Sequence, residues 1–213
     1  MNAIISSYCK IVPNKISVGG KLFFEEASEK ELPEFLSAAY KYGELNYPKF
    51  HKMDKLCKLG MLATELALRN CPDWKALDKS RIALIFSNQS SSLDSDRNHA
   101  HAISDKQNYF PSPSVFVYTL PNIIMGEIAI KHKISGENAF FISNQFDPEL
   151  LFSYSTILLQ TTGTEFVVCG WVNCDRTHND AFVYCVKKSN FKEQNSGPEL
   201  DHTSENIRQL YNT

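Results

Sequence analysis

The residues with the clearest chemical meaning form a polar tip between an apolar strand and an apolar helix. The run 139–143 (AFFIS) predicts a short strand, and Asp147 followed by Pro148 predicts a helix start. α/β enzymes often hold a nucleophile at such a turn, at the end of the sheet and next to a helix N-terminus. Here the tip carries Asn144 and Gln145. Neither amide titrates or attacks a substrate, but a carboxamide donates hydrogen bonds to a carbonyl oxygen.

The run 94–101 (DSDRNHAH) is the other candidate for chemistry, because it combines two aspartates with two histidines. Carboxylates and imidazoles are ligands for divalent metals. No distant ligand motif accompanies this run, so a solvated loop is the stronger interpretation and we predict no metal site. The serines of 90–92 lack a G-x-S-x-G frame, and Cys169 and Cys174 lack the second pair that a zinc site needs.

Composition and charge favour one compact cytoplasmic domain. A chain of 213 residues buries a substantial core without disulfides. The net charge of −2 gives no electrostatic support to a nucleic-acid partner or to a membrane surface. No apolar run is long enough for membrane insertion, and the N-terminus lacks a secretion signal. The six cysteines lie mostly in apolar runs, so we expect reduced thiols.

Hydrophobic periodicity predicts the elements that position these groups. We predict strands in 3–25 with a turn at 18–20, and at 82–86, 139–143, 167–172 and 181–186. We predict helices at 32–42, with Ser28 as the cap, and at 53–70, 99–106, 122–132 and 148–160. A polar loop is predicted at 87–96 and an extended segment at 110–114. Residues 189–213 are polar and are predicted to be mobile, apart from a short helix at 204–211.

Several blocks between residues 50 and 172 carry a recognisable pattern. They are 50–59 (FHKMDKLCKL) with its continuation 61–68, 81–86 (RIALIF), 119–129 (TLPNIIMGEIA), 136–138 (GEN) and 167–172 (VVCGWV). Taken in order, they resemble the motifs R-M-D-R-x-x-R-L, R-I-G-V-V, x-x-P-N-x-x-A-G-x-I-A, G-P-N and x-V-x-G-G. These motifs belong to the N-terminal half of the β-ketoacyl synthases, the condensing enzymes of fatty acid and polyketide synthesis. In that family the catalytic Cys follows the Gly of G-P-N by nine residues, and the same count from Gly136 arrives at Gln145.

The resemblance implies an α/β fold that is one half of a thiolase-like architecture. The expected half is a mixed five-stranded sheet with helices on both faces, in a single layered domain. The resemblance implies a β-ketoacyl synthase N-terminal-like domain at residues 1–188, followed by the polar C-terminal tail at 189–213. The residues implied to line the acyl site are Asn144, Gln145, Phe146 and Asn122.

The resemblance also implies that the chain does not catalyse condensation. In the family a thiolate attacks the acyl thioester and holds it covalently, and here Gln145 takes the position of that Cys. A complete ketosynthase has two similar halves, and its two catalytic histidines lie in the second half, which this sequence lacks. The histidines of this chain match no family motif: His51, His99, His101, His132, His178 and His202.

With a glutamine at the cysteine position, this chain resembles the chain-length-factor subunits of polyketide systems and the decarboxylating loading synthases. We therefore predict a non-catalytic, chain-length-factor-like subunit. It would act with an active condensing enzyme and an acyl carrier protein in bacterial fatty acid or polyketide synthesis of the polyene type. Two alternatives stay open, a Gln-type malonyl carrier protein decarboxylase and a thiolase-like interaction module without acyl binding. We predict no cofactor.

The helix at 148–160 predicts a partner chain, because its apolar residues cover nearly all of its sides. Such a helix is buried nearly all round, and soluble monomers avoid a large exposed apolar patch. In the ketosynthase family the equivalent helix lies between two sheets. We therefore predict that a second copy, or a complete ketosynthase, covers the outer face in a homodimer or heterodimer. The alternative is that the tail at 189–213 folds over this face.

Overall fold

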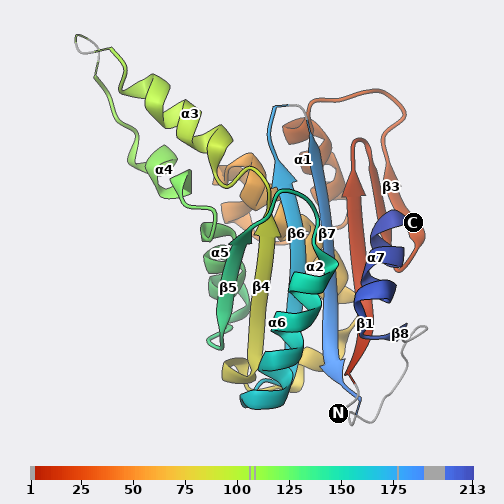
Figure 1. Cartoon of the computed structure of the whole chain (residues 1–213). Helices are drawn as coiled ribbons and strands as arrows, with labels where there is room; N and C mark the ends of the chain where they lie inside the picture. Colours follow the sequence, from red (N-terminus) through yellow and green to blue (C-terminus); the bar gives the residue numbers. More distant parts are fainter. Residues whose placement is uncertain (1–2, 106, 108, 177, 190–199) are drawn as a thin grey trace.

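One mixed β-sheet with helices on both faces organises the chain, in a computed structural model that describes residues 3–105, 107, 109–176, 178–189 and 200–213 (Figure 1). The strands are β1 (Ala3–Val12), β2 (Lys15–Val18), β3 (Lys21–Glu25), β4 (Ile82–Asn88), β5 (Asn138–Ile142), β6 (Phe166–Cys174), β7 (Asn179–Lys188) and β8 (Leu200–Asp201). The α-helices are α1 (Leu32–Tyr42), α2 (Lys55–Arg69), α3 (Leu93–Ala102), α4 (Pro113–Phe116), α5 (Ile123–His132), α6 (Pro148–Thr161) and α7 (Ser204–Asn212). Short 3-10 helices are η1 (Pro48–Lys52), η2 (Pro72–Ala76), η3 (Lys79–Arg81) and η4 (Val117–Thr119).

The strand order is β3-β2-β1-β7-β6-β4-β5, with β8 added beside β1. Strand β4 pairs in parallel with β5 and β6, and the other pairs are antiparallel. The predicted mixed sheet with helices on both faces is therefore confirmed. The predicted number of five strands is wrong, because β2, β3 and β8 extend a central group of five. Asn14, Gly19 and Gly20 have positive φ angles of 59°, 57° and 77°, so two tight turns divide 3–25 into three strands.

Strands β4 and β6, which pair in parallel, form the most deeply buried part of the sheet. Every residue of β4 and of β6 is buried, as the uninterrupted apolar run at 82–86 predicts. Gly170 of β6 lies opposite Phe86 of β4, and a Cβ at position 170 would come within 2.4 Å of the Phe86 ring. A glycine is required there because the aromatic ring fills the space that any side chain would occupy.

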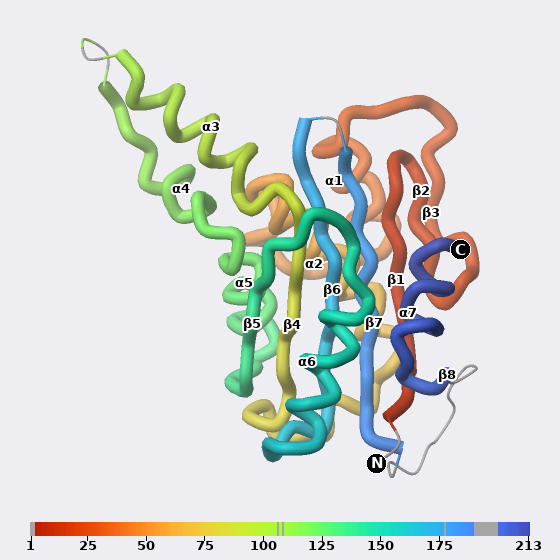
Figure 2. The backbone as a smooth tube through the Cα atoms, in the orientation of Figure 1, coloured from red at the N-terminus to blue at the C-terminus, as the bar shows by residue number. Residues whose placement is uncertain are grey.

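Helices cover each face of the sheet, and a hydrophobic core lies under each layer. Helices α1, α2 and α5 pack on one face, and α6 and α7 pack on the other (Figure 2). Helix α2 begins at its N-cap Asp54, whose carboxylate accepts from the Cys57 amide at 2.9 Å. Gly60 lets α2 approach α5 so closely that an added Cβ would come within 1.9 Å of Ile124 Cδ1.

Helices α3 and α4, with η4, form an arm that projects away from the sheet (Figure 1). The predicted loop at 87–96 and helix at 99–106 have the wrong bounds, because α3 spans Leu93–Ala102 and so begins inside the predicted loop. Residue 106 lies outside the described residues. Asp94 and Asp96 lie in its first turn and two histidines lie in its last turn, which suits the helix dipole. The Ser95 hydroxyl donates to Asp54 Oδ2 at 2.7 Å and fixes the arm to the start of α2.

The C-terminal part of the described chain packs on the sheet. The predicted helix at 204–211 is present as α7, which begins at its N-cap Thr203. Ile207 is fully buried against the sheet, and Leu210 is 7% exposed. Residues 190–199 of the predicted tail lie outside the described residues.

Within the described residues, no single helix is long and apolar enough to cross a membrane. One pair, Pro113–Thr119 with Ile123–His132, meets the requirement only together and is bent by 103°.

Candidate functional site

The predicted strand, tip and helix around Gln145 are present at the end of the sheet. Strand β5 ends at Ile142, and the Ser143 amide donates to the Asn88 carbonyl at 2.9 Å, which holds the tip to the end of β4. Helix α6 begins at Pro148, with Asp147 accepting from the Leu150 amide at 3.0 Å. Gln145 therefore emerges from the sheet edge immediately before a helix N-terminus.

Three of the four predicted site residues come together, and the fourth does not. Asn144 and Gln145 are exposed and, with Phe146, line a hollow of about 540 Å³ that also includes Arg208 of α7. Asn122 is the N-cap of α5 and lines a different pocket between α5 and the sheet. Because amide, carboxylate and guanidinium groups dominate its wall, the hollow is a polar surface site and not an apolar tunnel.

Phe146 is the anchor of the tip and points into the core. Its ring stacks on Tyr211 of α7, with ring centroids 4.0 Å apart and planes inclined by 24°. It also meets Phe182 and Trp171 edge-on, at centroid distances of 5.8 Å and 6.1 Å. Aromatic contacts of these kinds add to the burial of the ring. Phe146 thus fixes the backbone of the tip, while Asn144 and Gln145 face solvent.

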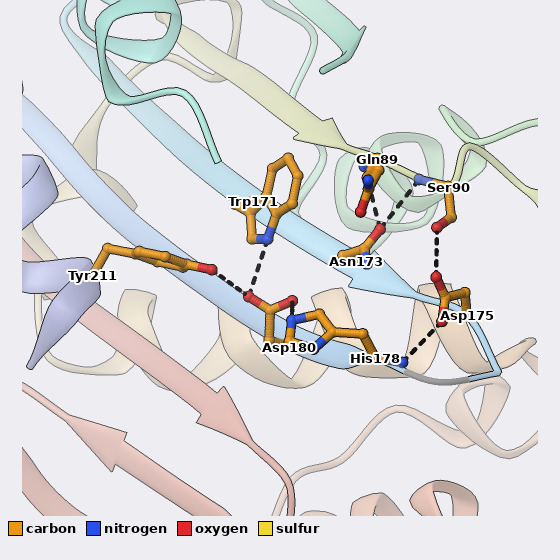
Figure 3. Close-up of polar contacts among 8 residues, drawn as sticks. All are labelled: Gln89, Ser90, Trp171, Asn173, Asp175, His178, Asp180 and Tyr211. Atoms are coloured by element: carbon orange, nitrogen blue, oxygen red, sulfur yellow. Dashed lines mark hydrogen bonds and ion pairs between the residues drawn. The ribbon is translucent and has the colours of Figure 1, made fainter. Parts of the chain in front are cut away.

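A buried carboxylate, Asp180 of β7, bonds to Trp171 and Tyr211, two of the aromatic residues that contact Phe146 (Figure 3). Its Oδ2 accepts from Trp171 Nε1 at 3.0 Å and from the Tyr211 hydroxyl at 2.9 Å, and His178 Nε2 lies 3.1 Å from Oδ1. Burial raises the pKa of Asp180, and the donors from Tyr211, His178 and Trp171 act against that rise. Sequence analysis missed this cluster, although a charged residue directly before the apolar run 181–186 was a signal for it.

Polar side chains also connect the end of β4 to the β6–β7 turn (Figure 3). Asn173 Oδ1 accepts from the amides of Gln89 and Ser90, each at 3.2 Å. The Ser90 hydroxyl donates to Asp175 Oδ2 at 3.0 Å, and the His178 amide donates to Asp175 Oδ1 at 2.8 Å. These bonds satisfy turn groups and hold together the end of the sheet from which the tip emerges.

The chain is similar to known proteins in its fold, but sequence comparison finds no match. No protein-family model and no curated protein matches the chain. The chain superposes on the ishigamide ketosynthase/chain length factor with a TM-score of 0.64 at 12% identity, covering 91% of this chain and 64% of the other. This chain has the fold of the ketosynthases and chain length factors.

Two further structures share this ketosynthase fold. The first is the ApeO ketosynthase in complex with its chain length factor ApeC from Xenorhabdus doucetiae, with a TM-score of 0.59, 11% identity, and coverage of 89% of this chain and 80% of the matched chain. The second is the AntDE:AntF complex of a type II acyl-carrier protein with its ketosynthase, with a TM-score of 0.62, 13% identity, and coverage of 88% and 62%. The present chain thus spans less than two thirds of the ishigamide and AntDE:AntF chains.

None of the cysteines of this ketosynthase-fold chain lines the hollow at the tip. All six cysteines are unpaired and buried. Burial raises the pKa of Cys169 and of Cys174 to about 12, so neither forms a thiolate near neutral pH. Within the described residues there is also no group of three or more His, Cys, Asp or Glu side chains placed to hold a metal ion, the run 94–101 included.

The flanks of α6 are packed against other parts of the chain, and its outward side is exposed. Helix α7 packs beside α6, and the ring of Phe152 lies against His202, 5.1 Å between centroids. On the other flank Tyr154 meets Phe141 edge-on at 5.1 Å. The positions that face outward are polar, apart from Ile157, which is 51% exposed. The C-terminal segment thus covers one flank of α6 and not the side that points away from the sheet. The prediction that α6 is buried nearly all round is wrong, because that outward side is exposed and mostly polar, and it gives no support to a partner chain.

Proposed function

We propose that this chain is a non-catalytic, chain-length-factor-like subunit. It acts with an active condensing enzyme and an acyl carrier protein in bacterial fatty acid or polyketide synthesis of the polyene type. The observation that carries the proposal is the exposed amide of Gln145 between β5 and α6, in a chain whose cysteines are all buried. An amide at this position binds a carbonyl oxygen but forms no acyl-enzyme.

The fold neighbours support the proposed partners. One of them is a ketosynthase in complex with its chain length factor, and another is a ketosynthase in complex with an acyl-carrier protein. By analogy, we propose a heterodimer with a complete ketosynthase, or a homodimer, that receives acyl chains from a carrier protein.

The unpaired edge of β5 and the arm are the surfaces that support such an assembly. Within the described chain, β5 pairs only with β4, so its outer edge has free backbone groups. The arm exposes Phe110 by 77% and Phe116 by 60%, and a monomer gains nothing from exposing them. Other exposed apolar side chains of this region are Leu93, Tyr109, Val117 and Leu120. Ketosynthases, which this chain resembles, use the comparable segment for subunit contact.

The open hollow favours a non-catalytic role over decarboxylation. Stabilising the enolate of a malonyl group requires preorganised donors in a site from which water is excluded. Gln145 and Asn144 are both exposed, and no hydrogen bond holds either side chain in place among the described residues. Such an amide fits the lining of an interface with an active subunit better than an oxyanion site.

The test is affinity purification of the tagged full chain from its native cell. We expect mass spectrometry to identify a condensing enzyme with an intact active-site Cys, or an acyl carrier protein. The double variant Phe110→Ser/Phe116→Ser should lose the condensing enzyme, because it removes the apolar side chains of the arm. The control Leu22→Ser changes a side chain of similar exposure, 57%, on β3 at the opposite edge of the sheet and should keep it. Recovery of neither protein by the unmodified chain would reject the proposal.

A second measurement separates the subunit from the enzyme. Malonyl carrier protein incubated with the purified chain should release carbon dioxide only at the rate of a buffer control. Release above that rate, abolished by Gln145→Ala, would replace the proposed role with a decarboxylase.

A further inference from the structure

One edge of β1 pairs with β8 and with β2, and the gap between these two strands forms a notch that is separate from the tip. Strand β8 pairs with β1 at Ile4 and Ile5, and β2 pairs with it only from Cys9 onward. Among the described residues, no strand pairs with Ser6 or Ser7 on this edge. The gap is a cavity of about 520 Å³, within the roughly 300–1,000 Å³ range of small-molecule pockets. Helix α7 and β8 lie along the same stretch of β1 (Figure 2).

The walls of the notch are mostly apolar. They comprise Ile5, Tyr8, Val18, Leu200 and Leu210, with Gly19 at the turn. Ser6 and Ser7 form the floor, but their hydroxyls are already used. The Ser7 hydroxyl donates to the Ala67 carbonyl at 2.8 Å, and the Ser6 hydroxyl donates to the Cys185 carbonyl at 3.3 Å. The interior therefore suits an apolar group, which needs no hydrogen-bond partner.

The rim of the notch is polar and carries one charge. Among the described residues that line it, Lys21 alone is charged, and Asn70 is the neighbouring amide. Both side chains are exposed, and the described residues offer Lys21 no carboxylate within ion-pair distance. An apolar interior beside an exposed ammonium that has no ion-pair partner among the described residues matches a molecule with an alkyl chain at one end and an anion at the other.

We propose that the notch between β2 and β8 binds a single-chain carboxylate, with the alkyl chain along Ile5, Val18 and Leu210 and the carboxylate at Lys21. Burial of the chain supplies most of the affinity, because each methylene that leaves water contributes favourably. Lys21 contributes selectivity for the charge of the head group. This site is independent of the proposed function, because the notch lies on β1 and the tip lies on β5, at different edges of the sheet order.

The test is isothermal titration of the full chain with dodecanoate and with dodecyltrimethylammonium, which has the same chain length and the opposite charge. We expect saturable binding of dodecanoate and weak or no binding of the cation. Lys21→Glu should weaken dodecanoate binding about fivefold, the size expected for an exposed ion pair. The control Lys52→Glu makes the same charge change at an exposed residue outside the notch and should leave binding unchanged.

Two further measurements complete the test. Val18→Trp should abolish binding of dodecanoate, because the larger side chain fills the cavity. Thermal unfolding of Val18→Trp and of Lys21→Glu shows whether each variant is folded. Dodecanoyl-pantetheine, a neutral thioester, distinguishes a carrier-linked chain from a free acid. No saturable binding of dodecanoate, or binding that Lys21→Glu leaves unchanged, would overturn the proposal, as would equal binding of the thioester. Lys21→Glu should still recover the condensing enzyme in affinity purification, so failure of this site is distinct from failure of the proposed function.

Discussion

The ring of Phe146, directly after Gln145, stacks on the ring of Tyr211 at the end of α7, with centroids 4.0 Å apart. These residues are 65 positions apart in the sequence, yet they share one aromatic cluster with Trp171 and Phe182. The hydroxyl of the same tyrosine donates to the buried Asp180 at 2.9 Å. Tyr211 therefore connects the C-terminal helix both to the tip and to the charged cluster around Asp180.

Removing the Tyr211 ring should destabilise the fold more than removing its hydroxyl. Tyr211→Ala loses the stack and leaves space beside Phe146, which we expect to cost about 2 kcal/mol of unfolding free energy. Tyr211→Phe keeps the stack but takes one donor from Asp180, at a cost of about 1 kcal/mol. Urea unfolding measures both values. Arg208→Ala, also on α7, breaks exposed ion pairs with Glu205 of α7 and Glu149 of α6 and should change stability by less than about 0.5 kcal/mol. Equal effects of the Ala and Phe variants would show that the stack contributes nothing.

Gly60→Ala should destabilise the protein although alanine favours helix. A Cβ at position 60 would come within 1.9 Å of Ile124 Cδ1, so α2 and α5 must separate, at a cost of about 2 kcal/mol. Ile124→Val removes that Cδ1 atom and alone should cost about 1 kcal/mol. The double variant should lose less than the sum of the two single changes, because valine accommodates the new methyl group. Chemical denaturation of the four proteins gives the coupling energy.

Gly126→Ala is the matched control for this cycle. Gly126 also lies within a helix, α5, and an added Cβ meets nothing within 4 Å. Alanine there should raise stability by roughly 0.5–1 kcal/mol through helix propensity alone. If both glycine replacements stabilised the protein equally, the close approach of α2 and α5 would be wrong.

Stability should fall as the pH drops from about 6.5 toward 4, because His202 is buried. Burial lowers the pKa of His202 from 6.5 to about 4. Between these values the unfolded chain takes up a proton that the folded chain does not, so acid favours unfolding, whereas above 6.5 both states are neutral. The loss between pH 7 and pH 5 should be about 2 kcal/mol.

Comparing variants separates the contribution of His202 to the pH dependence of stability from the contributions of other titrating side chains. Burial raises the pKa of Asp180, so its contribution has the opposite sign and is lost as the pH rises. His202→Phe should make the stability difference between pH 7 and pH 5 smaller, whereas the exposed His101→Gln should leave that difference unchanged. The same slope in all three proteins would mean that His202 titrates normally.

Thiol labelling should show that position 145 at the tip is accessible to solvent and that the native cysteines are not. All six native cysteines are buried, so an aromatic disulfide reagent should modify the folded protein only slowly. Gln145→Cys places a thiol at an exposed position and should add one rapidly reacting thiol per chain. A variant that reacts as slowly as the unmodified protein would show that the tip is closed.

The sequence predicted those helix ends that are set by residues next to them in the chain. Asp147 and Pro148 define the start of α6 as the sequence predicts, and α1 spans the predicted range, Leu32–Tyr42. Ser28 is not the cap of α1, because the helix begins after Glu31 and has no side-chain cap. The bounds of α3 were not predicted correctly, because the helix projects from the sheet and has only one buried residue, Ser95, so it shows no apolar stripe.

The site could be predicted only in part, because its supports come from distant segments. The tip is one continuous stretch, and its position follows from the strand and the helix on either side. The contacts of Asp180 with Trp171 and Tyr211 depend on the pairing of β6 with β7 and on where α7 docks, which no local pattern specifies. Asn122 belongs to a recognisable motif, but the sheet separates it from Gln145.

The pairing of β1 with β7 affects how the chain folds during synthesis on the ribosome. Ala3 lies opposite Lys188, so the first long strand finds its neighbour only after most of the chain has been made. Until then the nascent hairpin of β1 and β2 has an open inner edge, and pairing across such a sequence distance is slow. We therefore expect that chains interrupted before β7 require chaperones or aggregate, even though they already contain the complete tip.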